Sequence, residues 1–160
     1  MDTLELSQVI GERLRERGWK LATAESCTGG KIAQLITSIG GSSDYFQGGV
    51  VSYSNDAKVE LLGVSRATVE RVGAVSRECA AEMARGARVA LHANVGVSST
   101  GIAGPGGATA RKPVGLVYIG IATPAGEEVQ ELHLDGDRLT IIDAATRAAL
   151  ELVLKQVESA

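Results

Sequence analysis

Three short stretches hold the residue types that could do chemistry, residues 23–30, 51–58 and 99–107. Each lies at or just past the end of a predicted strand, where open α/β sheets place their binding sites. In the first, Ser26 stands in a glycine-containing turn before a predicted helix, where free N–H groups and the helix dipole can stabilise an oxyanion or a phosphate. The alternative is that Ser26 or Thr28 only caps that helix.

A nucleophilic serine needs a base, and histidine is the usual one. His92 closes a predicted helix and His133 lies in a predicted edge strand, so both are more simply structural residues. Lysine is the other known solution, and the second stretch offers Lys58 together with Tyr53 and Asn55. Because an ordinary lysine has a pKa of about 10.4, Lys58 acts as a base only if burial or nearby cations lower it. Otherwise it is a solvated surface lysine.

The third stretch places four glycines within seven residues, at positions 101, 104, 106 and 107. Such a loop lets backbone amides approach a ligand closely, as phosphate cradles do, and the alternative is a flexible surface loop. The loop lacks the Lys-Ser/Thr ending of a Walker loop and the glycine spacing of a dinucleotide fingerprint. Cys27 is a second candidate nucleophile, but we expect its side chain to point away from that of Ser26.

Composition narrows the function classes. With 16 Lys and Arg against 19 Asp and Glu the net charge is −3, which disfavours generic binding to nucleic acid or to an anionic membrane. Aromatic residues make up only 3 %, too few for base-stacking modules, whereas the 20 glycines favour loops that meet a ligand with backbone amides. Two cysteines, no leader-like segment and no long apolar run indicate a cytoplasmic protein without a membrane span.

The elements that must position these stretches alternate between helix and strand. Predicted strands cover residues 20–24, 46–53, 95–99, 114–123 and 128–134, the last two as a hairpin. Predicted helices end at Gly18, run from Thr28 to about Ile39 and from Ser76 to about Leu91, and begin near Asp137 or Thr140, with one or two short helical turns within 55–72. This pattern predicts one α/β domain over residues 1–160, a three-layer α/β/α sandwich on a mostly parallel mixed sheet of about five strands.

Taken together, the motifs resemble the CinA carboxy-terminal domain family, the nicotinamide-mononucleotide deamidases. The resemblance rests on TAESCTGG at 23–30, VSYSNDAK at 51–58, LLGV at 61–64, GAVS at 73–76, TGIAGPGG at 100–107, KPVG at 112–115 and GDR at 136–138. It covers essentially the whole chain. Larger members of the family carry an additional N-terminal pyrophosphatase domain, so we expect this chain to be the stand-alone form.

The resemblance implies hydrolysis of the carboxamide of nicotinamide mononucleotide to nicotinate mononucleotide and ammonia, for pyridine-nucleotide salvage. It implies Ser26 as the nucleophile, Lys58 as its base and Tyr53 as a supporting proton relay. It also implies no metal, no cofactor and a homo-oligomer whose partner is a small nucleotide. The expected substrate-binding residues are Thr28, Gly29, Gly30, Asn55, Thr100, Gly101, Gly104, Gly106 and Arg138.

One departure from the family pattern leaves alternatives open. GDR is usually followed a few residues later by a further arginine, and here that place holds Ile142 and Asp143. Because a nucleotide phosphate needs cationic or amide partners, the substrate is in question. The alternatives are a Ser/Lys hydrolase of a different amide and a catalytically silent nucleotide-binding paralogue.

Overall fold

A computed structural model describes all 160 residues. Its single open sheet holds five strands in the order β2-β1-β3-β4-β5. They are β1 (Leu21–Glu25), β2 (Phe46–Val51), β3 (Val95–Gly101), β4 (Leu116–Thr123) and β5 (Gly126–His133). Strand β1 pairs in parallel with β2 and β3, whereas β4 runs antiparallel to both β3 and β5. Four of the five strands therefore point the same way, as predicted for a mostly parallel mixed sheet.

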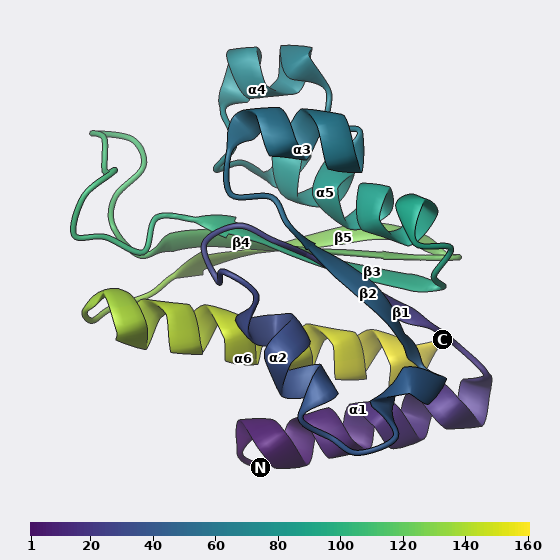
Figure 1. Cartoon of the computed structure of the whole chain (residues 1–160). Helices are drawn as coiled ribbons and strands as arrows, with labels where there is room; N and C mark the ends of the chain where they lie inside the picture. The colour runs from purple at the N-terminus through teal and green to yellow at the C-terminus, as the bar shows by residue number, and fades with distance from the viewer.

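Helices cover both faces of the sheet (Figure 1). One face carries α1 (Thr3–Arg17), α2 (Lys31–Thr37) and α6 (Arg138–Ser159), and the other carries α3 (Asn55–Leu62), α4 (Arg66–Val72) and α5 (Arg77–Ala90). A short 3₁₀ turn, Ser42–Asp44, precedes β2. The three-layer α/β/α prediction is therefore confirmed. No helix is long and apolar enough to cross a membrane.

The two layers of helices pack differently against the sheet, and this accounts for several of the glycines. Under α1, α2 and α6 lies a 22-residue core made mostly of Leu, Ile and Val side chains, with Tyr45 as its one fully buried aromatic residue. Helix α5 instead lies almost on the sheet backbone. A Cβ atom at Gly96 would stand 2.1 Å from the carbonyl oxygen of Ala84, and one at Gly120 would stand 2.4 Å from that of Ala80. Only glycine allows this approach, so much of the glycine content is structural.

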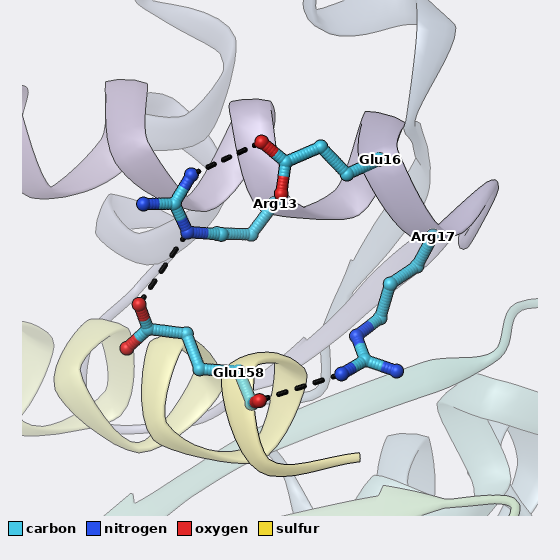
Figure 2. A network of polar contacts seen from close by, with 4 residues as sticks. All are labelled: Arg13, Glu16, Arg17 and Glu158. Atoms are coloured by element: carbon cyan, nitrogen blue, oxygen red, sulfur yellow. Dashed lines mark hydrogen bonds and ion pairs between the residues drawn. The ribbon is translucent and has the colours of Figure 1, made fainter.

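Polar contacts join the first and last helices at the surface (Figure 2). The Arg13 guanidinium contacts the carboxylate of Glu158 at 3.4 Å and that of Glu16 at 3.2 Å, and Arg17 donates to the Glu158 carbonyl at 3.4 Å. All of these side chains are exposed, so each ion pair contributes at most about 1 kcal/mol to stability. The apolar core between α1 and α6 holds the two helices together.

Element boundaries differ from the predictions by up to three residues. The second helix begins at Lys31 rather than Thr28, because Gly29 (φ 61°) and Gly30 (φ 105°) take left-handed conformations that interrupt it. Residues 26–30 therefore form a free-standing turn between β1 and α2. The last helix begins at Arg138, where the Asp137 side chain accepts a hydrogen bond from the Thr140 N–H.

Candidate active site

The three stretches meet at the carboxyl ends of β1, β2 and β3 and line one cavity of about 290 Å³. Because parallel strands end at the same edge of a sheet, segments far apart in sequence converge there. The predicted residues that line this cavity are Ser26, Tyr53, Asn55, Lys58, Thr100, Gly101, Gly104, Gly106 and Arg138. Thr28, Gly29 and Gly30 do not line it. The cavity's remaining walls come mainly from the 74–75 segment and the glycine-rich loop.

Ser26 and Lys58 are in direct contact at the floor of this cavity. The Lys58 Nζ atom lies 2.9 Å from the Ser26 Oγ, and it donates to the carbonyl oxygens of Ser52 at 2.7 Å and Tyr53 at 3.2 Å. Lys58 is only 1 % exposed: its helix, α3, packs against α5, and its amine reaches inward to Ser26 and the Ser52 carbonyl. The surface-lysine alternative does not describe this residue.

Burial lowers the pKa of Lys58 below that of an ordinary lysine, because desolvation disfavours the ammonium form. No carboxylate forms an ion pair with it. Its three neighbours are instead a hydroxyl and two carbonyl oxygens, all neutral. The neutral amine is therefore favoured at lower pH than for a solvated lysine, which is the condition for its use as a base.

The turn after Ser26 presents unused backbone donors. The Ser26 N–H donates to the carbonyl of Ser99 at 3.0 Å, and the Gly29 N–H returns to the Ser26 carbonyl at 3.0 Å. The N–H groups of Cys27 and Thr28 have no protein acceptor. Of the two, Cys27 lines the cavity, and a free amide directly after a candidate nucleophile is a usual component of an oxyanion hole.

Tyr53 and Arg138 contact each other across the mouth of the cavity. Arg138, the first residue of α6, donates to the Tyr53 hydroxyl at 3.0 Å and to the Gly104 carbonyl at 2.7 Å. The Tyr53 side chain is 61 % exposed, so its ring lies at the rim, while its carbonyl holds Lys58 inside. Besides Lys58, Arg138 is the only cationic residue that lines the cavity.

Several predicted binding residues have structural partners. The Thr100 hydroxyl donates to the carbonyl of Ala74 at 2.9 Å. At Gly101 and Gly104 an added Cβ would stand 2.6 Å from the side chains of Val117 and Val114 respectively, so packing alone requires glycine there. Gly106 has open space around it, and packing does not explain that glycine.

Cys27 is also among the residues that line the cavity, and its side chain packs with the apolar core under α1, α2 and α6. Burial raises the pKa of its thiol to about 11, so the reactive thiolate is scarce at neutral pH. Cys79, on the inner face of α5, is fully buried. Ser26, which contacts the Lys58 amine at 2.9 Å, is therefore a better candidate nucleophile than Cys27.

The two residues that depart from the family pattern lie outside the cavity. Asp143 pairs with Lys31 at the surface, and Ile142 packs against the core. His92 follows α5 with a left-handed backbone (φ 52°), and His133 ends β5 at the edge of the sheet. Neither histidine lines the cavity. No three His, Cys, Asp or Glu side chains come together as a metal site would require.

Three residues that the sequence interpretation did not single out support the site. Glu25 is fully buried beside Ser26, Ser52 supplies a carbonyl to Lys58, and Ser99 bonds both Ser26 and Thr28. A glutamate at the end of a short, mostly apolar strand is the one signal that could have indicated the first of them.

Known proteins match the chain along nearly its whole length. The CinA C-terminal domain model matches residues 3–157. The chain is 50 % identical over 155 residues to a CinA-like protein of Thermosynechococcus vestitus and 46 % identical over 157 residues to one of Amoebophilus asiaticus, and it spans 37 % of the length of each. Both relatives are thus much longer than this chain.

Solved structures show the same fold. Competence/damage inducible protein CihA from Agrobacterium tumefaciens aligns with a TM-score of 0.94 at 44 % identity, covering 99 % of this chain and 96 % of that one. A CinA superfamily protein from Escherichia coli aligns with a TM-score of 0.91 at 33 % identity, covering 98 % and 92 %. Family match and fold agree: the chain belongs to the CinA C-terminal domain family.

Proposed function

We propose that this protein is an amidohydrolase that converts nicotinamide mononucleotide to nicotinate mononucleotide and ammonia, with Ser26 as nucleophile and Lys58 as its base. The observation that supports this proposal most strongly is the set of hydrogen-bond partners around the Lys58 amine. Carbonyl oxygens can only accept hydrogen bonds, so Lys58 directs N–H groups at Ser52 and Tyr53. A neutral amine has two N–H groups and one lone pair. With both N–H groups used, its lone pair faces the Ser26 hydroxyl at 2.9 Å.

This arrangement supports a two-step acyl transfer. The Ser26 Oγ attacks the carboxamide carbon while Lys58 takes the hydroxyl proton, and the oxyanion that forms accepts from the free N–H group of Cys27. The Lys58 ammonium then protonates the amide nitrogen, the C–N bond breaks and ammonia leaves. Lys58, neutral again, takes a proton from water, which attacks the ester. Returning that proton to the Ser26 oxygen releases the carboxylic acid, which loses its proton to solvent, and restores the enzyme.

Tyr53 takes part in this mechanism chiefly through its carbonyl, which fixes the Lys58 amine. Its phenol is held by Arg138 at the rim. To relay a proton, as the resemblance implies, the phenol would have to leave Arg138 and turn inward when substrate binds. An anionic substrate that binds Arg138 would release the Tyr53 phenol and allow it to turn inward.

The cavity's charge and lining suit a mononucleotide. A volume of about 290 Å³ is at the lower end of small-molecule sites, so it accommodates the pyridine carboxamide while the rest of the nucleotide extends to the rim. With Arg138 and Gly106 located towards that rim, a phosphate there meets a guanidinium and backbone amides. The absence of an arginine at 142 and 143 removes no group from this wall, because neither position lines it.

The direct test is ammonia release by the purified protein from nicotinamide mononucleotide, with and without a chelator. We expect turnover of the mononucleotide that the chelator does not change. Ammonia release from a different amide, with the mononucleotide left intact, would identify the protein as another Ser/Lys hydrolase. Binding of the mononucleotide without turnover of any amide would identify the silent paralogue.

Arg138→Ala should weaken binding of the phosphate end of the substrate. Loss of one charge-assisted bidentate contact costs about 1.5–3 kcal/mol, so we expect KM to rise about 10- to 100-fold with a smaller change in kcat. Steady-state kinetics on nicotinamide mononucleotide and on its riboside, which lacks the phosphate, measure this. For the riboside, KM should change little between wild type and Arg138→Ala. Arg111→Ala, an exposed arginine outside the cavity, is the control. An equal loss with both substrates would contradict a phosphate role.

A further inference from the structure

Glu25, the last residue of β1, is a buried carboxylate directly before the candidate nucleophile. It has no exposed surface and it does not line the cavity. Its carboxylate accepts three hydrogen bonds, from the Thr28 hydroxyl at 2.6 Å and from the N–H groups of Ile32 at 2.9 Å and Ala33 at 3.0 Å. A buried charge is expensive unless it is fully hydrogen-bonded, and here three donors satisfy it.

The carboxylate caps α2 from outside that helix. The residue at the N-cap position is Gly30, which offers no side-chain acceptor to the first turn. The Glu25 side chain reaches past the turn and takes the free N–H groups of the first helical turn instead. The start of α2 is thus fixed to the end of β1, and the turn that carries Ser26 spans the gap between them.

A hydrogen-bond chain fastens the same turn to the neighbouring strand β3. Since the single hydroxyl hydrogen of Thr28 goes to Glu25, the 2.6 Å contact between Thr28 and Ser99 has Ser99 as its donor. The Ser99 carbonyl in turn accepts from the Ser26 N–H at 3.0 Å. Ser26 is therefore bracketed by Glu25 on one side and by Thr28 on the other, both fixed in the protein interior.

The main chain of Glu25 is tied to the lysine side of the site. Its carbonyl accepts from the Ser52 N–H at 2.8 Å, and the Ser52 carbonyl accepts from Lys58 at 2.7 Å. One residue thus connects the turn that bears the nucleophile, through its side chain, with the segment that holds the base, through its backbone. The 2.9 Å contact between Ser26 and Lys58 lies between these two connected segments.

We propose that Glu25 is a positioning residue that, through Thr28, sets the Ser26 hydroxyl against Lys58 and holds the free amide of Cys27 at the cavity wall. The inference rests on the proposed role of Ser26 as nucleophile. Because Glu25 acts through other groups and touches no substrate, its loss affects the reacting geometry and leaves the binding surface in place.

Glu25→Gln tests this, since the side chain keeps its size but turns an NH₂ group towards donors that need an acceptor. A misplacement of about 1 Å reduces turnover on the order of 10²-fold, so we expect kcat to fall about 10²-fold while KM changes less than about twofold. The rate at which a fluorophosphonate probe labels Ser26 should fall in parallel. Thr28→Val should do the same to a lesser degree, and Thr28→Ser, which keeps the hydroxyl, should restore both rates.

A stability-matched control separates positioning from general loosening of the fold. Ile36→Ala removes a fully buried side chain from the same helix without touching the carboxylate. It should lower the Tm as Glu25→Gln does, yet keep kcat within about threefold. If Ile36→Ala lost as much turnover at the same Tm, or if Glu25→Gln folded and kept its kcat, the proposal would be overturned. Should Glu25→Gln fail to fold, the Thr28→Val and Thr28→Ser pair decides.

The probe also separates this inference from the proposed substrate. Labelling of the wild-type protein at Ser26 that slows in Glu25→Gln supports the positioning role even if nicotinamide mononucleotide is not hydrolysed. Turnover of the mononucleotide with unchanged labelling and unchanged kcat in Glu25→Gln supports the proposed function and overturns the role of Glu25.

Discussion

Ser26→Ala should abolish ammonia release from nicotinamide mononucleotide. The substitution removes only the oxygen atom that would form the acyl intermediate, and no other hydroxyl contacts the Lys58 amine. Loss of a catalytic serine that acts together with its base reduces kcat by about 10³- to 10⁶-fold, because the whole covalent route is lost. Single-turnover and steady-state ammonia assays measure the effect, and fluorophosphonate labelling should disappear with it. Binding of the mononucleotide should persist, since the cavity and Arg138 are unchanged.

Ser42→Ala provides a matched control for this experiment. Ser42 has the same 9 % exposure as Ser26, and its hydroxyl makes no hydrogen bond in the structure. The same chemical change there should leave kcat and KM at their wild-type values. Turnover in Ser26→Ala within tenfold of wild type would contradict a serine nucleophile, and the thiol of Cys27 would then be the next candidate to replace.

The arrangement of the sheet could be predicted from the sequence for a physical reason. Each chemical stretch follows an apolar run of strand type, and parallel strands bring their carboxyl ends to one edge. That rule places residues 26, 53 and 100 together before any coordinates are known. It does not place Arg138, which enters the cavity from the start of α6; only the family resemblance indicated that residue.

The burial of Lys58 could not be predicted, because it depends on how α3 packs against its neighbours. Periodicity in residues 55–62 is compatible with an exposed lysine, and the fold instead encloses the side chain beneath the cavity. In the glycine-rich loop, by contrast, the sequence indicates the correct residues but not the reason for them. The sequence predicts Gly101 and Gly104 as ligand contacts, yet the side chains of Val117 and Val114 already require glycine at these two positions. Sequence shows that a glycine is needed and leaves open whether a ligand or a neighbour needs it.

Lys58→Met should reduce kcat about as strongly as Ser26→Ala, because the hydroxyl loses the base that activates it. Lys58→Arg should fail equally, since a guanidinium stays protonated at every accessible pH. An equal loss is expected because nucleophile and base act as one unit, so the double variant Ser26→Ala/Lys58→Met should be no worse than either single one. Lys155→Met, at an exposed position on α6, is the control that should behave as wild type.

The pH dependence of the wild-type enzyme tests the same amine without a substitution. Desolvation lowers the pKa of Lys58 in the folded protein. We therefore expect kcat/KM to rise with pH to a plateau, and the midpoint of this rise to lie below the ordinary lysine pKa of about 10.4. A midpoint at or above that value would contradict a desolvated base.

The free energy of unfolding must also depend on whether the Lys58 amine is protonated. Between the lowered pKa of the folded state and the ordinary pKa of the unfolded chain, the unfolded chain binds more protons, so the free energy of unfolding increases with pH across that window. As the pH falls through it, wild type loses stability relative to Lys58→Met, which has no proton to bind there. Denaturant titrations of the two proteins at several pH values measure the difference. If the rise in kcat/KM and the divergence in stability occur in the same window, one amine accounts for both.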